Sequence, residues 1–183
     1  MNKKIILLSH CILNEYSKVR GYDKGENYEP DTLDFIKILM ENNIGIIQLP
    51  CPETTCYGLK RWGNVKDQFN HPHYRKMCRK LFEPYLDQII EYKSNDFQIV
   101  AILGIFGSPT CGVNKTCIGD WGGEIGSNPN LGETLSTISS IDSSGIFIEE
   151  INKILDKNNL DIPLIDFNKE NLELTIESIE KLI

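Results

Sequence analysis

The stretch Gly107-Ser108-Pro109-Thr110-Cys111-Gly112 follows an apolar run, Phe97-Gln98-Ile99-Val100-Ala101-Ile102-Leu103, which ends at Gly104. The run shows no alternation of apolar and polar residues, as expected for a parallel strand that helices cover on both faces. The glycines, proline and hydroxyl residues of the following stretch predict a tight polar turn. The turn places the thiol of Cys111 just past a predicted buried strand.

Two earlier cysteines lie in the same kind of position. Cys11 follows the apolar run at residues 4–10. Cys51 follows a second apolar run at residues 44–49, and prolines on either side of it prevent continued strand pairing. Three thiols, each just past a predicted strand, are the main indication of function.

Strands and helices alternate along the predicted chain. Four strands are expected, at residues 4–10, 44–49, 97–103 and 162–165. Helices are expected from Asp31 or Thr32 to about residue 43, at residues 71–94, from Ser143 or Ser144 to about residue 157, and at residues 168–182. This alternation indicates an α/β fold with right-handed crossovers. We expect a single domain over residues 1–183, with a three-layer Rossmann-like fold and a mainly parallel sheet of about four strands in the order 2-1-3-4.

The spacing of apolar residues predicts which helix faces are buried. In the helix that begins near residue 31, the buried side is expected to carry Leu33, Ile36, Leu39 and Met40. In the helix at residues 71–94, one apolar stripe includes Cys78 and Ile90, which makes Cys78 a core residue. Pro84 is expected to kink that helix or divide it in two.

Three long connections separate these elements. Residues 14–30 are rich in glycine and charge, and we expect a surface excursion there. Residues 54–70 are expected to form a binding loop or lid without regular structure. Residues 113–142 form the third connection, with one weak strand expected near residues 116–120.

Charge and hydropathy argue against two classes of partner. The net charge of −7 and the isoelectric point of about 5.0 argue against nucleic acid, because proteins that bind the phosphate backbone usually carry a basic face. No apolar run approaches the roughly 20 residues that span a bilayer, so we expect no membrane partner and a cytoplasmic location. The motifs GxGxxG and GxxxxGK(S/T) are both missing, and with them the usual phosphate cradle. The oligomeric state, monomer or homodimer, stays open.

The six cysteines are expected to be free thiols or metal ligands, since a globular chain of this size does not need disulfides. Their spacing contains no CxxC pair, which argues against a zinc ribbon or knuckle. If strand 1 lies between strands 2 and 3, Cys11, Cys51 and Cys111 converge at the carboxyl ends of neighbouring strands. Crowded thiolates repel unless a cation neutralises them, and an iron-sulfur cluster with one open iron fits three thiols better than zinc. The alternative is that the three cysteines are small buried hydrophobic residues.

Several motifs occur in the order typical of one family. They are Ser9-His10-Cys11-Ile12-Leu13-Asn14, Pro50-Cys51-Pro52-Glu53, Gly58-Leu59 with Arg61, Ser108-Pro109-Thr110-Cys111-Gly112, and Gly145-Ile146-Phe147 leading to Ile162-Pro163. In these motifs the chain resembles the thiouracil desulfidase (TudS-type) family, from the first predicted strand to the fourth. The loop after Cys51 departs from that family's usual Gly- and Pro-rich form, so the chain is interpreted as a divergent member.

The resemblance implies a four-iron four-sulfur (4Fe-4S) cluster bound by Cys11, Cys51 and Cys111, whose open iron takes the sulfur of a thiolated substrate. It also implies a non-redox desulfidase, acting on a small compound such as a thiopyrimidine. In that reaction the iron polarises the carbon–sulfur bond, water attacks the carbon, Glu53 deprotonates the water, and Ser108 orients or relays the proton.

Simpler roles are open to both catalytic candidates. Glu53 could accept backbone N–H bonds in its turn or neutralise Lys60 or Arg61. Ser108 could serve only as a turn or cap residue, which is a common role of serine.

Candidate substrate contacts are Asn14, Arg61 and Trp62. An aromatic ring beside cations suits a planar, polar heterocycle. Cys56 and Cys117 are loop cysteines near the site; we expect them to lie beside the ligands or to be incidental, and the alternative is that either one reaches a cluster.

Two other classes of function compete with the desulfidase. One is a non-catalytic iron-sulfur protein or sulfide carrier, and the other is a metal-free α/β module that binds a small molecule and whose thiols are incidental. The iron content of anaerobically purified protein separates the metal-free class from the other two. Sulfide release from 2-thiouracil then separates enzyme from carrier.

Overall fold

The computed structural model describes residues 3–19 and 32–183. Its main sheet has four strands, all paired in parallel, in the order β2-β1-β3-β6. These strands are β1 (Lys4–Leu8), β2 (Ile44–Gln48), β3 (Gln98–Ile105) and β6 (Leu164–Phe167). Because β6 is the fourth of the predicted strands, the expected order 2-1-3-4 is confirmed.

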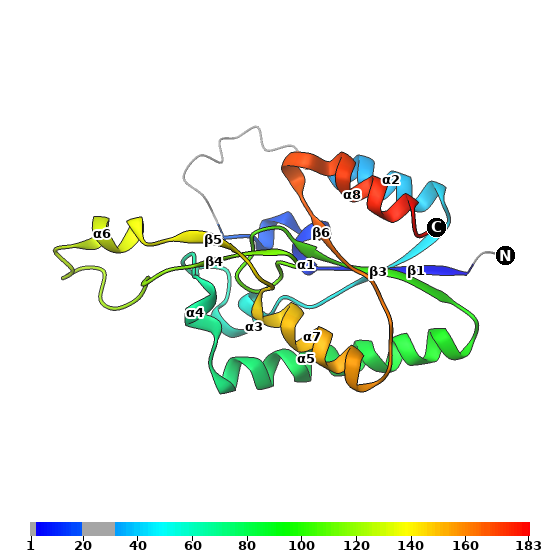
Figure 1. Cartoon of the computed structure of the whole chain (residues 1–183), viewed down its shortest axis with the longest axis horizontal. Coiled ribbons are helices and arrows are strands. Elements are labelled where there is room, and N and C mark those ends of the chain that lie inside the picture. The colour runs from blue at the N-terminus through cyan, green and yellow to red at the C-terminus, as the bar shows by residue number, and fades with distance from the viewer. Residues whose placement is uncertain (1–2, 20–31) are drawn as a thin grey trace.

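Helices cover both faces of this sheet, which confirms the three-layer α/β fold. The helices α2 and α8 pack on one face, and α5 and α7 pack on the other (Figure 1). The helical elements are α1 (His10–Leu13), η1 (Glu15–Ser17), α2 (Thr32–Glu41), α3 (Pro52–Tyr57), α4 (Lys66–Phe69), α5 (Pro72–Ser94), α6 (Leu131–Ser136), α7 (Ile146–Lys157), η2 (Lys169–Asn171) and α8 (Leu172–Glu180). Among these helices of the described ranges, none has both the length and the apolar character needed to cross a bilayer.

Strand β1 lies between β2 and β3 and is buried along its whole length. Ile5 and Leu7 belong to the hydrophobic cluster on the side of α5 and α7, whereas Ile6 and Leu8 belong to the cluster on the side of α2 and α8. Successive side chains of a strand point to opposite faces, so a strand with helices on both faces has apolar residues throughout. This is why the apolar runs of the sequence show no alternation.

Helix α5 is amphipathic and is one helix through Pro84, so of the two predicted effects of Pro84 the division is wrong and the kink stays a prediction. Pro84 lies on the exposed side, where water can bind the carbonyl group that loses its N–H partner.

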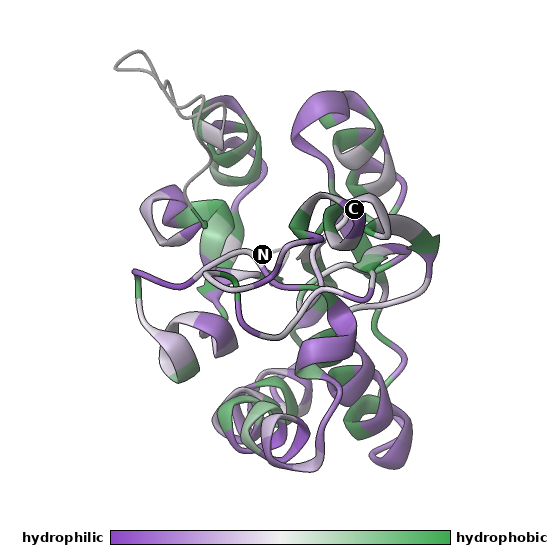
Figure 2. Cartoon of the chain, turned by 90° about the vertical axis from the view of Figure 1, so that its left-hand side faces the viewer, coloured by the Kyte–Doolittle hydropathy of each residue, from purple (hydrophilic) through white to green (hydrophobic). Residues whose placement is uncertain are grey.

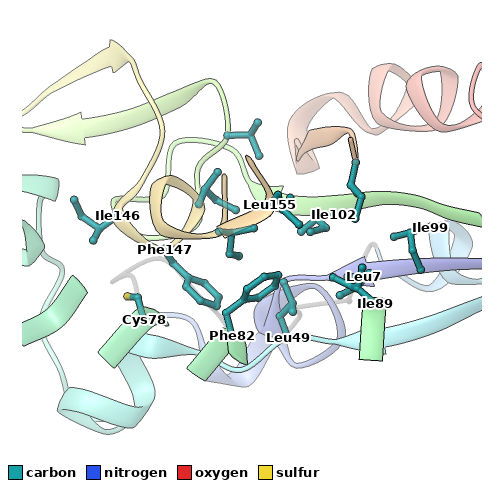
Figure 3. Close-up of a cluster of buried hydrophobic side chains, with 14 of the residues drawn as sticks. Leu7, Leu49, Cys78, Phe82, Ile89, Ile99, Ile102, Ile146, Phe147 and Leu155 are labelled. Carbon is teal, nitrogen blue, oxygen red and sulfur yellow. The ribbon is translucent and has the colours of Figure 1, made fainter. Parts of the chain in front are cut away.

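Cys78 is fully buried beside Phe82 and Phe147 in the core (Figure 3), which confirms its packing role. Ile90, expected in the buried stripe, is 41% exposed. Figure 2 shows hydrophobic and hydrophilic segments on the same helices, as an amphipathic layer requires.

The buried face of α2 is only partly the predicted one. Phe35 and Leu39 are fully buried, whereas Leu33 is 61% and Met40 is 63% exposed. Phe35 and Leu39 lie one turn apart on the side that faces the sheet, and Leu33 and Met40 are rotated away from it. Ile36 is partly buried, as expected. The predicted start at Asp31 lies outside the described residues, as does most of the predicted excursion at residues 14–30.

The ends of several elements differ from the prediction. Strand β1 stops at Leu8, and His10, predicted as its last residue, opens α1. The connection at residues 54–70, expected to be irregular, holds most of α3 and all of α4. Helix α7 begins after Gly145 rather than at Ser143 or Ser144.

Hydrogen bonds explain the later start of α7. Ser144 Oγ donates to the carbonyl oxygen of Val113 (2.6 Å), and Ser143 Oγ accepts from Lys66 Nζ (2.7 Å). Both hydroxyls are thus bound to other segments and do not cap the helix.

A second sheet of two antiparallel strands projects from the body of the molecule (Figure 1). The weak strand predicted near residues 116–120 is confirmed as β4 (Lys115–Ile118). Its partner β5 (Ser139–Asp142) and the short helix α6 were not predicted, because both are short and neither shows an apolar pattern that identifies it.

Candidate functional site

Cys11, Cys51 and Cys111 lie at one edge of the main sheet and line the same cavity, whose volume is about 240 Å³. They follow β1, β2 and β3, which are neighbours in the order β2-β1-β3. Parallel strands end at the same edge of a sheet, so residues that follow three adjacent strands are brought together. The other residues of the described wall are Lys18, Val19, Glu53, Arg61, Gly63, Asn64, Ile105, Ser108 and Pro109.

Cys51 occupies the N-cap of α3, and Pro52 follows at the first helical position. Its sulfur accepts hydrogen bonds from the backbone N–H of Thr54 (3.4 Å) and from Thr54 Oγ1 (3.2 Å). A hydrogen bond from Cys11, together with those from Thr54, lowers the pKa of the Cys51 thiol to about 6 although burial opposes the change. A thiol at the N-terminus of a helix is favoured as thiolate, which is the form that binds metals.

Cys11 lies in α1, and its sulfur is 3.3 Å from Ser17 Oγ, which donates to the carbonyl oxygen of Asn14. The hydrogen bond with Cys51 and burial raise the pKa of Cys11. The same hydrogen bond lowers the pKa of Cys51 and raises the pKa of Cys11, so the two thiols titrate as a pair.

Cys111 is held by the turn that follows β3. Ser108 Oγ accepts the backbone N–H groups of Thr110 (3.3 Å) and Cys111 (3.0 Å). Gly104 allows the turn to fold back on β3, because a Cβ there would lie 2.1 Å from the carbonyl oxygen of Cys111. Gly107 has a φ of 75°, which favours glycine. Burial raises the pKa of the Cys111 thiol well above its usual value.

Glu53 pairs with Arg61 at the cavity wall. Arg61 Nε lies 3.0 Å from Glu53 Oε2, and the side chains are 3% and 13% exposed. The contact that neutralises Glu53, one of the two simpler roles considered for it, is therefore present. Glu53 thus lies in the same cavity wall as the three thiols, with the guanidinium group of Arg61 at its carboxylate.

The three candidate substrate contacts have different positions. Arg61 is part of the cavity wall. The wall formed by the described residues includes neither Asn14, whose side chain lies 3.2 Å from His10 Nε2, nor Trp62, which is 69% exposed. Asn14 and Trp62 are therefore not brought together with the thiols.

Several residues near the thiols were not identified from the sequence, and four of them are polar. Thr54 and Ser17 contact the sulfurs of Cys51 and Cys11, and Lys18 and Asn64 belong to the cavity wall. Thr54 has a signal in the sequence, because a helix start at Pro52 makes Cys51 the N-cap and places Thr54 three residues later. Ser17 lies in the short 3-10 helix η1, and Lys18 and Asn64 lie in irregular segments. No sequence pattern in these segments indicates which way a side chain points.

The remaining cysteines lie apart from this wall, and all six cysteines are free. Cys78 is in the core, Cys56 is exposed on α3, and Cys117 Sγ is 3.8 Å from the carbonyl oxygen of Asn64. Asn64 is a wall residue, so Cys117 is next to the site but outside it.

The chemistry of these side chains suits a soft metal such as iron in an iron-sulfur cluster, because three thiols line one cavity and the lowered pKa of Cys51 favours its thiolate. The buried hydroxyl of Ser9, two residues before Cys11, lies beside the Cys111 thiol and lowers its pKa, although burial has the larger, opposite effect. In the ranges 3–19 and 32–183, no three side chains of His, Cys, Asp or Glu form a group that could hold a metal ion. The ligands of one zinc ion all lie about 2.0–2.3 Å from it, whereas the cysteines of a 4Fe-4S cluster bind different irons and stand farther apart. The ligation by three cysteines stays a prediction.

Comparison with solved structures finds similarity to a 4Fe-4S-dependent thiouracil desulfidase, TudS, over 98% of this chain and 99% of that one. The TM-score is 0.49 and the sequence identity is 16%, and a likeness of this size does not bear on activity. No protein-family model matches the chain.

Comparison with curated proteins finds a match along nearly the whole chain. The Uncharacterized protein MJ0003 of Methanocaldococcus jannaschii is 31% identical over 183 residues, which cover 99% of this chain and 97% of that protein. The chain therefore belongs to the same family as MJ0003 of Methanocaldococcus jannaschii.

Proposed function

We propose that the protein is an iron-sulfur-dependent, non-redox desulfidase that removes sulfur as sulfide from a small thiolated compound such as a thiopyrimidine. One observation carries the proposal: three thiols from neighbouring strand ends share a cavity wall with Glu53 and Ser108. The motifs around these residues, which resemble those of the thiouracil desulfidase family, support the same reaction.

Cys11, Cys51 and Cys111 would hold a 4Fe-4S cluster through three of its irons. When bound, the cluster supplies an open iron that acts as a Lewis acid toward the sulfur of the substrate. The low pKa of Cys51 makes this residue the first of the three to be available as thiolate at neutral pH.

The reaction is a hydrolysis without electron transfer. A carbon–oxygen bond forms between water and the thiocarbonyl carbon, and the carbon–sulfur bond breaks. A thiocarbonyl compound and water give a carbonyl compound and hydrogen sulfide, so both protons of the water end on the sulfur. Glu53 accepts the first proton as the carbon–oxygen bond forms and returns it to the departing sulfur.

Ser108 would donate a hydrogen bond during these steps. Its oxygen accepts two backbone N–H groups, which uses its acceptor capacity, and its O–H hydrogen is the group it can offer to a ligand. Ser108 therefore does stabilise the turn, as the simpler role requires. The proposed catalytic role uses its O–H hydrogen, which the bonds to Thr110 and Cys111 do not use.

The rest of the wall suits a flat ring. Val19, Ile105 and Pro109 provide apolar surface, and Lys18 and Asn64 add two polar groups beside it. Small-molecule sites usually combine a mainly apolar lining with a few polar groups that fix orientation. A thiolated heterocycle has this combination of flat apolar faces and polar edges.

The proposal is tested by anaerobic reconstitution with iron and sulfide, followed by measurement of sulfide released from 2-thiouracil. We expect iron bound by the wild-type protein, and loss of both iron and activity in Cys11→Ser, Cys51→Ser and Cys111→Ser. Cys56→Ser is the matched control and should retain both, since Cys56 is exposed and outside the cavity wall. Wild-type protein that binds a cluster and releases no sulfide from any thiopyrimidine would instead indicate a carrier.

Glu53→Gln tests the proton transfer separately from cluster binding. The amide cannot accept the proton of the water, so turnover should fall by at least about 100-fold, the usual contribution of a positioned general base. The visible absorbance of the cluster should persist, and Glu41→Gln at an exposed helix end should leave turnover unchanged. An active Glu53→Gln enzyme would remove Glu53 from the mechanism and leave the cluster proposal standing.

A further inference from the structure

Arg61 is buried at the cavity wall, and its guanidinium group binds several segments of the chain. The side chain is 3% exposed. Its hydrogen bonds join Nε to Glu53 Oε2 (3.0 Å), Nη1 to Thr54 Oγ1 (3.3 Å) and to the carbonyl oxygen of Gly58 (3.1 Å), and Nη2 to the carbonyl oxygen of Ser17 (2.7 Å). Four of the five N–H donors of the guanidinium group are thus bound to the protein itself.

Two of these contacts lead directly to thiols. Thr54 Oγ1 accepts from Arg61 and donates to the sulfur of Cys51 (3.2 Å). Ser17 accepts from Arg61 through its carbonyl group, and its hydroxyl lies 3.3 Å from the sulfur of Cys11. Arg61 is therefore one residue removed from both Cys11 and Cys51.

The contacts cross between segments that secondary structure does not join. Ser17 ends η1, in the segment that follows β1, whereas Glu53 and Thr54 belong to α3, in the segment that follows β2. The sheet fixes the ends of β1 and β2. The short helices that follow these strands need further contacts to hold Cys11 and Cys51 at a constant distance from each other. A planar guanidinium group, with donors in fixed directions, can hold both segments at once.

We propose that Arg61 is a positioning residue, which fixes the Cys11 segment against the Cys51 segment and orients the carboxylate of Glu53. Only the orientation of the Glu53 carboxylate for catalysis rests on the proposed function; the contact between the two segments does not. This assignment also changes the role expected for Arg61 from the sequence, because contacts within the described residues already use four of the five N–H donors of its guanidinium group.

Hydrogen exchange on the metal-free protein tests the inference without any assay of activity. In Arg61→Ala, amides at residues 10–18 and at residues 52–58 should both exchange about tenfold faster, while amides of β3 keep their rates. Lys60→Ala is the matched control, since Lys60 is the exposed neighbour in the same loop, and it should change neither segment. Unchanged exchange at residues 10–18 in Arg61→Ala would overturn the inference.

Kinetics of the reconstituted enzyme separate positioning from substrate contact. Arg61→Ala should lower kcat by about 100-fold, because small displacements of catalytic groups have effects of this size, while KM stays within about threefold. Added guanidinium ion should restore part of kcat, and ammonium ion should not, since only guanidinium reproduces the planar set of donors. A higher KM with kcat unchanged would make Arg61 a substrate contact and overturn the inference.

A second variant covers the case in which Arg61→Ala does not fold. Arg61→Lys keeps the charge but can make fewer of the four bonds, so faster exchange at residues 10–18 is again expected. If wild-type protein releases no sulfide, the proposed function fails and hydrogen exchange still decides the role of Arg61. If wild-type protein is active and the variants match it in exchange and kcat, the role of Arg61 fails and the proposed function stands.

Discussion

Gly104 shows how a single residue sets the position of a thiol. It lies in β3, and the turn that carries Cys111 folds back so closely that a Cβ on Gly104 would lie 2.1 Å from the carbonyl oxygen of Cys111 and 2.7 Å from Val113 Cγ2. Backbone atoms cannot yield to such a contact as a flexible side chain can. The turn can therefore pack against β3 only because residue 104 has no side chain.

Gly104→Ala should destabilise the protein by about 3 kcal/mol, the upper range for overpacking a close-packed site. Urea unfolding followed by circular dichroism measures the change in free energy of unfolding. Gly45→Ala in β2 is the control, because a Cβ there meets its nearest atoms at an ordinary 3.5 Å, and it should change stability by less than about 1 kcal/mol. Equal stability of the two variants would contradict the close approach.

At the level of residues, the sequence predicted which thiols line one cavity and part of the cavity wall, but not the hydroxyl groups that contact the sulfurs. Cys11, Cys51 and Cys111 could be grouped because their positions depend on strand ends and strand order, which apolar runs reveal. The partner Ser17 could not be assigned, because α1 and η1 are short helices without a strong periodic pattern. The direction of a side chain in such segments depends on tertiary contacts.

Helices α5 and α7 are joined by a group of ion pairs centred on Glu150. The carboxylate of Glu150 is 2% exposed and bonds to Arg75 (2.6 Å), Lys153 (2.9 Å) and Arg79. Burial alone would raise the pKa of Glu150, but hydrogen bonds from Lys153, Arg79 and Arg75 lower it from 4.5 to about 2. The charged form is thus more stable in the folded protein than in the unfolded chain.

The sign of the pH dependence follows from this lowered pKa. A carboxyl group with a lower pKa in the folded state stabilises the protein above its unfolded pKa of 4.5, and this contribution is lost as the pH falls toward about 2. At roughly 1.4 kcal/mol per pKa unit, the contribution at pH 7 is about 3 kcal/mol.

Glu150→Gln should therefore be less stable than wild type by about 3 kcal/mol at pH 7, and the difference should shrink between pH 4.5 and the lowest pH at which both unfold reversibly. Urea unfolding at a series of pH values measures it. Glu83→Gln, at an exposed position of α5, should show no such trend. A difference that stays constant across the range would exclude Glu150 as the titrating group.

Elements differ in how far the sequence predicts them. Long elements with a strong apolar pattern, such as β3 and α5, were predicted to within a few residues. The strand β5 was missed because Ser139 and Ser140 carry no apolar signal, and its pairing with β4 is a contact between residues far apart in the chain. Capping by Ser143 or Ser144 was predicted from residue type alone, whereas their hydroxyls bind Lys66 and Val113.

Across the whole molecule, the candidate site joins three strands of one sheet. Residues after β1, β2 and β3 supply the thiols, and the remaining strand β6 supports the third segment, since Asp166 accepts the backbone N–H of Val113 (2.8 Å). The long apolar strands and their order were sufficient to predict this arrangement. If the three segments together bind a cluster, the protein loaded with iron and sulfide should be more stable than the metal-free protein.

Loading with iron and sulfide should raise the melting temperature, because a group that binds only the folded protein stabilises it, by about 2.7 kcal/mol at a concentration 100 times its dissociation constant. For a chain of this length that corresponds to a rise of roughly 5 to 10 °C. The rise should disappear in Cys11→Ser, Cys51→Ser and Cys111→Ser alike, since each removes one of three strand ends from the cluster, and should persist in Cys56→Ser. Differential scanning fluorimetry under anaerobic conditions, before and after removal of iron with a chelator, makes the comparison. A loaded protein with an unchanged melting temperature would show that the three thiols do not hold the iron together, because a ligand bound by all three segments cannot leave the unfolding equilibrium unchanged.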